Sequence, residues 1–329
     1  MWVLMIVGFS LWKPDLFPTM DTVRAILNLN ALSGLAALAV LVPMASGAID
    51  ASIGGNISLT SVCCAWLFQN TGFSMWEVVA ITLGIGATIG LVNVFVVVVL
   101  KIPSIIGTLA VWLICDALSV AVAGSQSSLS PIQLSGTFGN YFAQNSWQNL
   151  TIPVLFLVIL GVVMGTLLTQ TASGRYTYAV GLNPDVARNT GVRVKLIQSS
   201  ALVIGGILGA FAGMVLTAQY ASAAPASGGA YLLPAFAAVF LGATQFRLKR
   251  FTAWGTILAV FMLATGKYGL ALAGAATWIP NVFEGFALII AIGISQQVFS
   301  KTSGVRGSRR RPAPGAPLGT ESPAGVSVT

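Results

Sequence analysis

The chain has 329 residues, of which 56% are hydrophobic and only 7% are charged, and its mean hydropathy is +0.88. A soluble domain carries about 25% charged residues on a surface that faces water, so this composition excludes a soluble protein and indicates an integral membrane protein. The formal net charge is +8, and the sequence contains no histidine, the commonest general base and metal ligand.

Long apolar runs rich in Gly and Ala predict membrane-spanning helices rather than the alternating strands of a barrel. Because a helix needs roughly 20 apolar residues to cross the hydrocarbon core, we expect an all-α polytopic protein with about 10 transmembrane helices. They are placed near residues 1–12, 26–45, 51–69, 76–99, 103–123, 152–169, 196–218, 230–245, 252–270 and 279–299. The first run is too short for a full crossing, so either the true start lies upstream or this helix enters at an angle.

The positions of Lys and Arg orient these helices, since cytoplasmic loops collect cations. With both termini inside, all of the 16 cations except Lys13, Arg24 and Lys267 fall on the cytoplasmic side. This topology accounts for the positive net charge. We therefore expect no nucleic-acid binding, which would require a basic face with interleaved aromatic residues on a soluble domain.

A break follows the second span, in "SGAIDASIGG" at residues 46–55. Gly47 permits the chain to turn, and Asp50 and Ser52 can cap the next helix. Either Asp50 is only a cap, or the break lines a translocation path and orients backbone groups there, with Gly54 as a further candidate. Asn93 in "GLVNVF" either hydrogen-bonds between helices or lines the same path.

A second break, "ASAAPASGGAY" at residues 221–231, follows the seventh span. In the expected topology the two breaks lie on opposite sides of the membrane. This placement favours an inverted repeat of spans 2–5 and 7–10, an arrangement in which broken helices often line transport sites.

The largest cytoplasmic loop, residues 174–195, contains a short punctuated helix in "GLNPDVARNTGV". The pattern consists of a capping amide, a proline at the first helical position, an acid near the positive end of the helix dipole and a closing glycine. This segment is either an ordinary basic loop or a rigid docking helix for a cytoplasmic partner. Its candidate residues are Asn183, Pro184, Asp185, Ala187, Arg188 and Gly191.

Other chemistry is sparse. There is no phosphate-binding G-x-x-x-x-G-K loop, and the eight acidic residues make no obvious catalytic pair. Cys63, Cys64 and Cys115 match no paired metal or redox spacing. We therefore expect no catalytic residue, metal or cofactor. Few ionisable residues in the spans favour transport of an uncharged solute, with energy for active transport supplied by another subunit.

Several motifs together resemble the ribose-type branch of the ABC transporter permeases. "GRYTYAVGLNPDVARNTGV" resembles the family's cytoplasmic coupling segment, and "SGAIDASIGG" is similar to its G-G-I-D-L-S-V-G motif. Further matches are "GLVNVFVVVVLKIPSIIGTLA" at 90–110 and "PAFAAVFLGAT" at 234–244. The resemblance extends over about residues 12–299. The related branched-chain amino-acid permeases lack the G-I-D-x-S-x-G segment, so the sugar branch is favoured.

The resemblance implies a non-enzymatic permease subunit of a bacterial ABC importer in the inner membrane. Its solute would be a sugar or sugar-like molecule of the ribose, xylose, rhamnose, polyol or autoinducer class. Its partners would be a second permease subunit, identical or paralogous, two ATPase subunits and an extracytoplasmic solute-binding protein. The segment 183–191 would then be the coupling helix. The alternatives are a stand-alone secondary transporter or facilitator for a small neutral solute, and a membrane-embedded enzyme.

Three features depart from the family pattern or stay unassigned. Asp116 in "LICDALSV" and Glu284 in "NVFEGF" have no evident partner, and both are candidates for the permease–permease interface. A cluster of cations, Arg247, Lys249 and Arg250, replaces a Gly-rich turn and is either a topology anchor or an ATPase contact. We divide the chain into a transmembrane domain at 1–300 and a disordered cytoplasmic tail at 301–329, basic and then rich in Pro, Gly and Ser.

Overall fold

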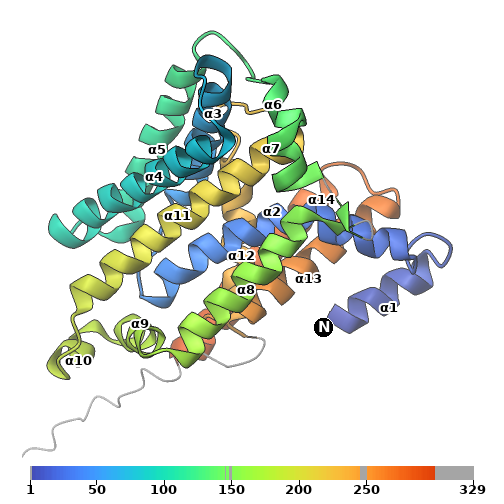
Figure 1. Cartoon of the computed structure of the whole chain (residues 1–329). Coiled ribbons are helices and arrows are strands. Elements are labelled where there is room, and N and C mark those ends of the chain that lie inside the picture. The colour runs from blue at the N-terminus through green and yellow to red at the C-terminus, as the bar shows by residue number, and fades with distance from the viewer. Residues whose placement is uncertain (1, 145, 148–149, 245–249, 301–329) are drawn as a thin grey trace, which may run out of the picture.

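The computed structural model describes residues 2–144, 146–147, 150–244 and 250–300, and these are overwhelmingly helical (Figure 1). The predicted tail and the cations Arg247 and Lys249 lie outside the described residues. The long helices are α1 Trp2–Trp12, α2 Met20–Ala45, α3 Ile53–Asn70, α4 Met75–Val94, α5 Ser104–Ala123, α8 Ile152–Gln170, α11 Val194–Tyr220, α12 Gly229–Gly242, α13 Ala253–Leu272 and α14 Ile279–Ser300.

Shorter elements connect them. A π-helical turn, η1 Phe95–Val99, extends α4. The main loop on the predicted outer side contains α6 Ile132–Ser135, α7 Thr137–Gly139, η2 Asn140–Gln144, and the antiparallel strands β1 Ser146–Trp147 and β2 Leu150–Thr151. On the predicted cytoplasmic side lie α9 Ala172–Leu182 and α10 Pro184–Asn189. Figure 1 shows α9 and α10 at one end of the bundle and α6 and α7 at the other.

Every predicted span coincides with a helix in the predicted order, which confirms the all-α class. Six helices of the described residues are long and apolar enough to cross a membrane: α2, α4 with η1, α5, α8, α11 and α13. Three further apolar helices are shorter, with 10–17 residues each: α1, α12 and the part of α14 at 279–293. The predicted number of 10 crossings is therefore not established by helix length.

The helix α3 is internal, which explains its lower apolarity. It carries Asn56, Ser58, Thr60 and Ser61, and all four are fully buried inside the bundle. Two of them reach other segments: Asn56 donates to the carbonyl of Gly206 on α11 at 2.8 Å, and Ser58 accepts from the amide of Gly228 at 2.9 Å. Thr60 donates to the Asn56 carbonyl of its own helix at 2.6 Å, and the Ser61 hydroxyl has no hydrogen-bond partner in the described part of the chain. Asn56 and Ser58 thus direct polar groups at membrane depth toward other segments of the bundle, where no water is present.

The helix neighbours show the same pattern in both halves of the bundle. The helix α11 packs against α3 and α4 of the first half, and α2 packs against α12 and α13 of the second. Likewise α3 contacts α5, and α12 contacts α14. The two breaks lie at opposite ends of α11. The first break touches α9 through Gly47 and Gly181, close to the start of α11, and the second break, at 221–228, directly follows the end of α11. This arrangement agrees with an inverted repeat of α2–α5 and α11–α14.

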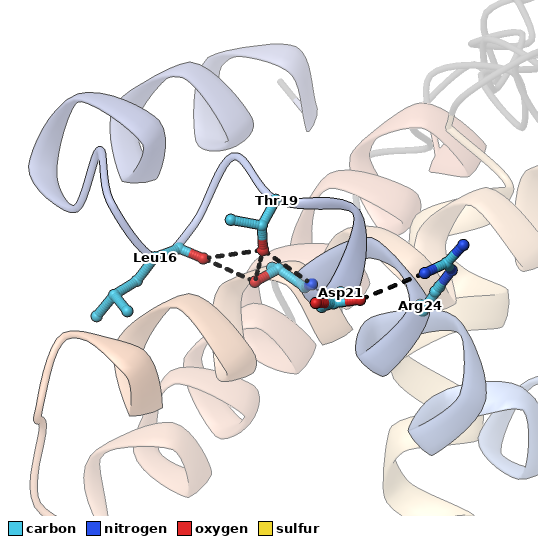
Figure 2. A network of polar contacts seen from close by, with 5 residues as sticks. Leu16, Thr19, Asp21 and Arg24 are labelled. Atoms are coloured by element: carbon cyan, nitrogen blue, oxygen red, sulfur yellow. Dashed lines mark hydrogen bonds and ion pairs between the residues drawn. The ribbon is translucent and has the colours of Figure 1, made fainter. Parts of the chain in front are cut away.

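A polar turn joins α1 to α2 (Figure 2). The Thr19 hydroxyl caps α2 by accepting from the Thr22 amide at 3.2 Å, and the Thr22 hydroxyl donates to the Leu16 carbonyl at 2.9 Å. Asp21 pairs with Arg24 at 3.3 Å in the first turn of α2. At its other end α1 is attached to α13, since the Trp2 indole donates to the Thr265 hydroxyl at 2.9 Å.

Glycines bring α4 and α11 into direct backbone contact. A methyl group on Gly86 would lie 2.6 Å from the Gly206 carbonyl oxygen, and one on Gly90 would lie 2.7 Å from the Val203 Cα. Lipid tails are as apolar as leucine, so helices in a membrane associate through such close van der Waals packing rather than through the hydrophobic effect. The contact fixes the relative position of the two halves.

We predict that Gly86→Val lowers the stability of the purified protein, because the new side chain cannot fit between α4 and α11. The expected cost is about 1–3 kcal/mol, the range for overpacking. The matched control is Gly84→Val on the same helix, where an added methyl group meets nothing within 4 Å. The measurement is the fraction of monodisperse protein in detergent after heating. Equal survival of the two variants would contradict the tight contact.

Candidate functional site

The short helix α10 begins as predicted. The Asn183 side-chain oxygen accepts from the amides of Asp185 at 3.0 Å and Val186 at 3.1 Å, and Pro184 occupies the first helical position. Such a cap contributes about 1 kcal/mol because it satisfies amides that the helix itself cannot. The predicted start of the helix is confirmed.

The end of α10 is also closed by specific hydrogen bonds. Gly191 has φ +85°, the Val192 amide donates to the Ala187 carbonyl at 3.1 Å, and the Gly191 amide donates to the Arg188 carbonyl at 3.0 Å. This pair of bonds around a left-handed glycine is a Schellman motif. With both ends capped, these residues form a compact rigid element instead of a flexible loop.

The two faces of α10 differ in character. Ala187 is only 3% exposed and packs with Val180, Val194 and Ile197 against α9 and α11. The opposite face presents Val186, which is 58% exposed, beside the exposed ion pair of Asp185 and Arg188 at 3.4 Å. Ala187 therefore anchors the helix, and its neighbours form the exposed surface. Ala187 was among the predicted docking residues and Val186 was not, because the sequence of a six-residue helix is too short to show which face is inward.

The break between α2 and α3 touches the end of α9 through backbone atoms. Gly47 has φ +84°, and a methyl group there would lie 3.2 Å from the Gly181 Cα. A methyl group on Gly181 would overlap the Ala45 carbonyl oxygen and lie 3.2 Å from the Gly47 amide nitrogen. Gly181 immediately precedes Leu182 and the Asn183 cap. The structure thus joins α10 to the break through a contact that tolerates no side chain.

Beyond Gly47, three of the predicted path residues form one buried cluster. The Asp50 carboxylate accepts from the Ser52 amide at 2.9 Å and from the Ser52 hydroxyl at 2.6 Å. The Asn93 side-chain amide donates to the Ser52 hydroxyl at 2.6 Å and to both Asp50 oxygens at 3.3 Å. All three side chains are fully buried. They contact one another, so the hydrogen bond predicted for Asn93 joins α4 to the break between α2 and α3.

Ser52 precedes α3 as expected, yet it does not cap the helix. Its side chain makes no cap hydrogen bond, because the hydroxyl is directed to Asp50. Two backbone amides of the break are satisfied from α5: the Ile49 amide donates to Ser104 at 3.2 Å, and the Ala51 amide donates to Thr108 at 3.0 Å. Gly54 follows Ser52 by two residues, beside the Trp112 ring and Gly229.

The two unassigned acids have different environments. The Lys267 ammonium lies 2.7 Å from the Glu284 carboxylate, so the expectation that Glu284 lacks a partner is wrong. Asp116 accepts from the Trp112 indole at 2.7 Å on the same face of α5, and its other oxygen is buried without a hydrogen bond in the described part of the chain. Cys63, Cys64 and Cys115 are free thiols. Among the described residues no group of three or more potential ligands of the His, Cys, Asp or Glu type could hold a metal ion.

Comparison with known proteins relates this chain to transport permeases. The family model described as "Branched-chain amino acid transport system / permease component" matches residues 22–292. The ribose import permease protein RbsC of Bacillus subtilis (strain 168) is 30% identical over 295 residues, covering 88% of each chain. The fructose import permease protein FrcC of Rhizobium meliloti is 27% identical, over 90% of this chain and 83% of the relative.

Two further similarities extend this set. The autoinducer 2 import system permease protein LsrD of Escherichia coli (strain K12) is 26% identical, over 79% of each chain. An ABC transporter of the metal-chelate type, solved in an inward-facing conformation, has a TM-score of 0.50 and 16% identity over 91% of this chain and 97% of that chain. At that identity the likeness concerns the fold alone.

We predict that Asn93→Leu destabilises the protein, because it removes a hydrogen-bond donor that Asp50 and Ser52 share in the interior. Leaving a buried acceptor unsatisfied costs about 1–3 kcal/mol, and more for a charged group. Thr88→Val on the exposed face of the same helix is the control, since Thr88 donates only to the Gly84 carbonyl of its own helix. The thermal unfolding midpoint should fall for Asn93→Leu and stay near the wild-type value for Thr88→Val. Equal midpoints would show that the cluster does not hold the break.

Proposed function

The chain belongs to the ABC importer permease family that the branched-chain amino acid permease model describes, and on that premise we propose that it is the translocation subunit of an importer for a small polyhydroxylated solute. It is a multi-pass inner-membrane protein, as its apolar helices and its relatives indicate. The relatives are named for ribose, fructose and autoinducer 2. An uncharged solute agrees with the scarcity of ionisable side chains in the spans.

The observation that carries this proposal is the capped helix α10 and its connection to the break. We propose that the exposed face of α10, formed by Val186, Asp185 and Arg188, seats on an ATPase subunit. The caps at Asn183 and Gly191 keep this face rigid, as a docking element requires. A stand-alone carrier would have no evident use for a rigid cytoplasmic helix of this kind.

We further propose how movement reaches the membrane. Displacement of α10 would be passed by Gly181 to Gly47, and from there to the segment that holds Asp50, Ser52 and Asn93. These three residues would keep the broken helix in one shape while it moves, rather than contact the solute, because their side chains are fully buried. Gly54 would allow the start of α3 to pass close to α12. In this proposal the segment 174–195 couples the ATPase to the membrane domain, and the candidate path residues hold the shape of the break.

The rest of the assembly follows the family pattern in this proposal. Two permease subunits, identical or paralogous, would form the pore between them, two ATPase subunits would supply the energy, and an extracytoplasmic binding protein would deliver the solute. ATP hydrolysis would occur only in the partner, because the sequence has no phosphate-binding loop of its own. The loop at 124–151 is the natural place for the binding protein to dock, since it is the largest predicted outer segment.

The docking proposal is tested by co-purification of the tagged permease with a co-expressed ATPase subunit. Val186→Glu combined with Arg188→Glu should reduce the recovered ATPase about tenfold or more, as expected for loss of a central apolar contact and a charge. Lys101→Glu is the control, because it makes the same charge reversal as Arg188→Glu elsewhere on the cytoplasmic side. Recovery that is equal for wild type and the double variant would contradict docking through α10, and ATPase-independent sugar uptake would favour a stand-alone carrier.

A further inference from the structure

Two adjoining cavities run along α13 from its cytoplasmic end into the membrane. The first, of about 290 Å³, lies between α8, α9 and the start of α13, and its polar lining residues are Thr169, Arg175, Tyr178, Arg250 and Thr252. The second, of about 510 Å³, is lined mainly by apolar residues of α13. Thr169 and Thr252 line both cavities, so the two form one continuous crevice.

The cytoplasmic cavity is positively charged. It contains the guanidinium groups of Arg175 and Arg250, and among the described residues none that lines it is acidic. Arg250 lies over the Tyr178 ring at 5.4 Å from the centroid, and the Tyr178 hydroxyl donates to the Phe251 carbonyl at 2.5 Å. Arg175 donates a long hydrogen bond of 3.5 Å to the Gln170 carbonyl. Two cations with little anionic compensation form a site for an anion, and guanidinium groups match a phosphate through paired donors.

The second cavity has the character of a hydrocarbon groove. Trp254, Ile257, Leu258 and Phe261 line it along α13, and it reaches Trp2 of α1. Trp254 is 47% exposed near the predicted cytoplasmic boundary, where tryptophan is commonly found. The crevice therefore continues from a basic polar end into the apolar interior of the membrane. A molecule with an anionic head and an apolar tail matches both parts.

We propose that this crevice binds an anionic phospholipid of the cytoplasmic leaflet, with its phosphate at Arg175 and Arg250 and an acyl chain in the groove along α13. Basic pockets between helices on the cytoplasmic side are suited to anionic headgroups. A free phosphate ion would occupy the basic end and leave the apolar groove empty. A soluble sugar would match neither the charge nor the apolar lining.

The position of the crevice gives the lipid a structural consequence. Tyr178, Ala179 and Leu182 of α9 form one wall of the basic cavity, and Gly181, which touches the break, lies among them. A bound headgroup would hold α9 against the start of α13. The lipid would thus stabilise the helix that connects α10 to the membrane domain. Binding of lipid at this site does not depend on which solute is transported.

The test measures phospholipid retained by the full chain after purification in mild detergent, followed by addition of phosphatidylglycerol or phosphatidylcholine and native mass spectrometry. The wild type should retain phosphatidylglycerol in preference to phosphatidylcholine. Arg175→Gln with Arg250→Gln should reduce this retention about tenfold or more, given the attraction expected for two cations near a membrane surface. Arg175→Lys with Arg250→Lys should restore most of it, because the charges return.

Two further variants separate the head from the tail. Arg193→Gln with Lys195→Gln removes two exposed cytoplasmic cations that do not line the crevice, and retention should be unchanged. Leu258→Trp fills the groove while leaving both arginines in place, and retention should fall. Three outcomes would overturn the proposal. The Arg175/Arg250 and Arg193/Lys195 glutamine variants could lose the lipid equally, Leu258→Trp could retain it unchanged, or inorganic phosphate alone could displace it.

Discussion

The structure depends on satisfying the backbone where α2 stops and α3 begins. Inside a membrane every exposed amide and carbonyl must find a partner in the protein, since water is absent. Here Ser104 and Thr108 of α5 accept from the amides of Ile49 and Ala51, and Asp50 accepts from Ser52. A broken helix is stable under these conditions only because two further helices, α4 through Asn93 and α5 through Ser104 and Thr108, supply hydrogen-bonding groups. The break therefore ties α3, α4 and α5 into one unit.

Glycine gives that unit its connection to the cytoplasmic side. The Gly47–Gly181 contact places the backbone of the break against the backbone of α9, with no flexible side chain between them. In the proposed coupling, a displacement would pass through this contact with little loss, because packed backbones cannot adjust by changing rotamers. On the other side of Gly181 the helix α10 is closed by its own caps. A rigid helix, a close contact and a buried hydrogen-bonded cluster thus follow one another from the cytoplasm into the membrane.

The sequence predicted those features that depend on local rules. The Asn183 cap, the left-handed Gly191, the positions of both breaks and the order of the helices all follow from residues within a few positions of one another. Features that depend on tertiary packing were not predictable. Asn93 lies 43 residues from Asp50, and Lys267 lies 17 residues from Glu284. No local pattern indicates such partners, which is why Glu284 was expected to be unpaired and Asn93 was only one of several candidates.

The central claim is that Gly181 transmits movement from α10 to the break, and the most direct measurement is the ratio of sugar imported to ATP hydrolysed by the reconstituted importer. It would compare Gly181→Val with Ala172→Val, an exposed position on the same helix, using ribose or fructose, whichever the wild type imports. The account predicts that Gly181→Val still binds the ATPase but imports far less sugar per ATP, while Ala172→Val behaves as the wild type. A normal ratio in Gly181→Val would contradict the account.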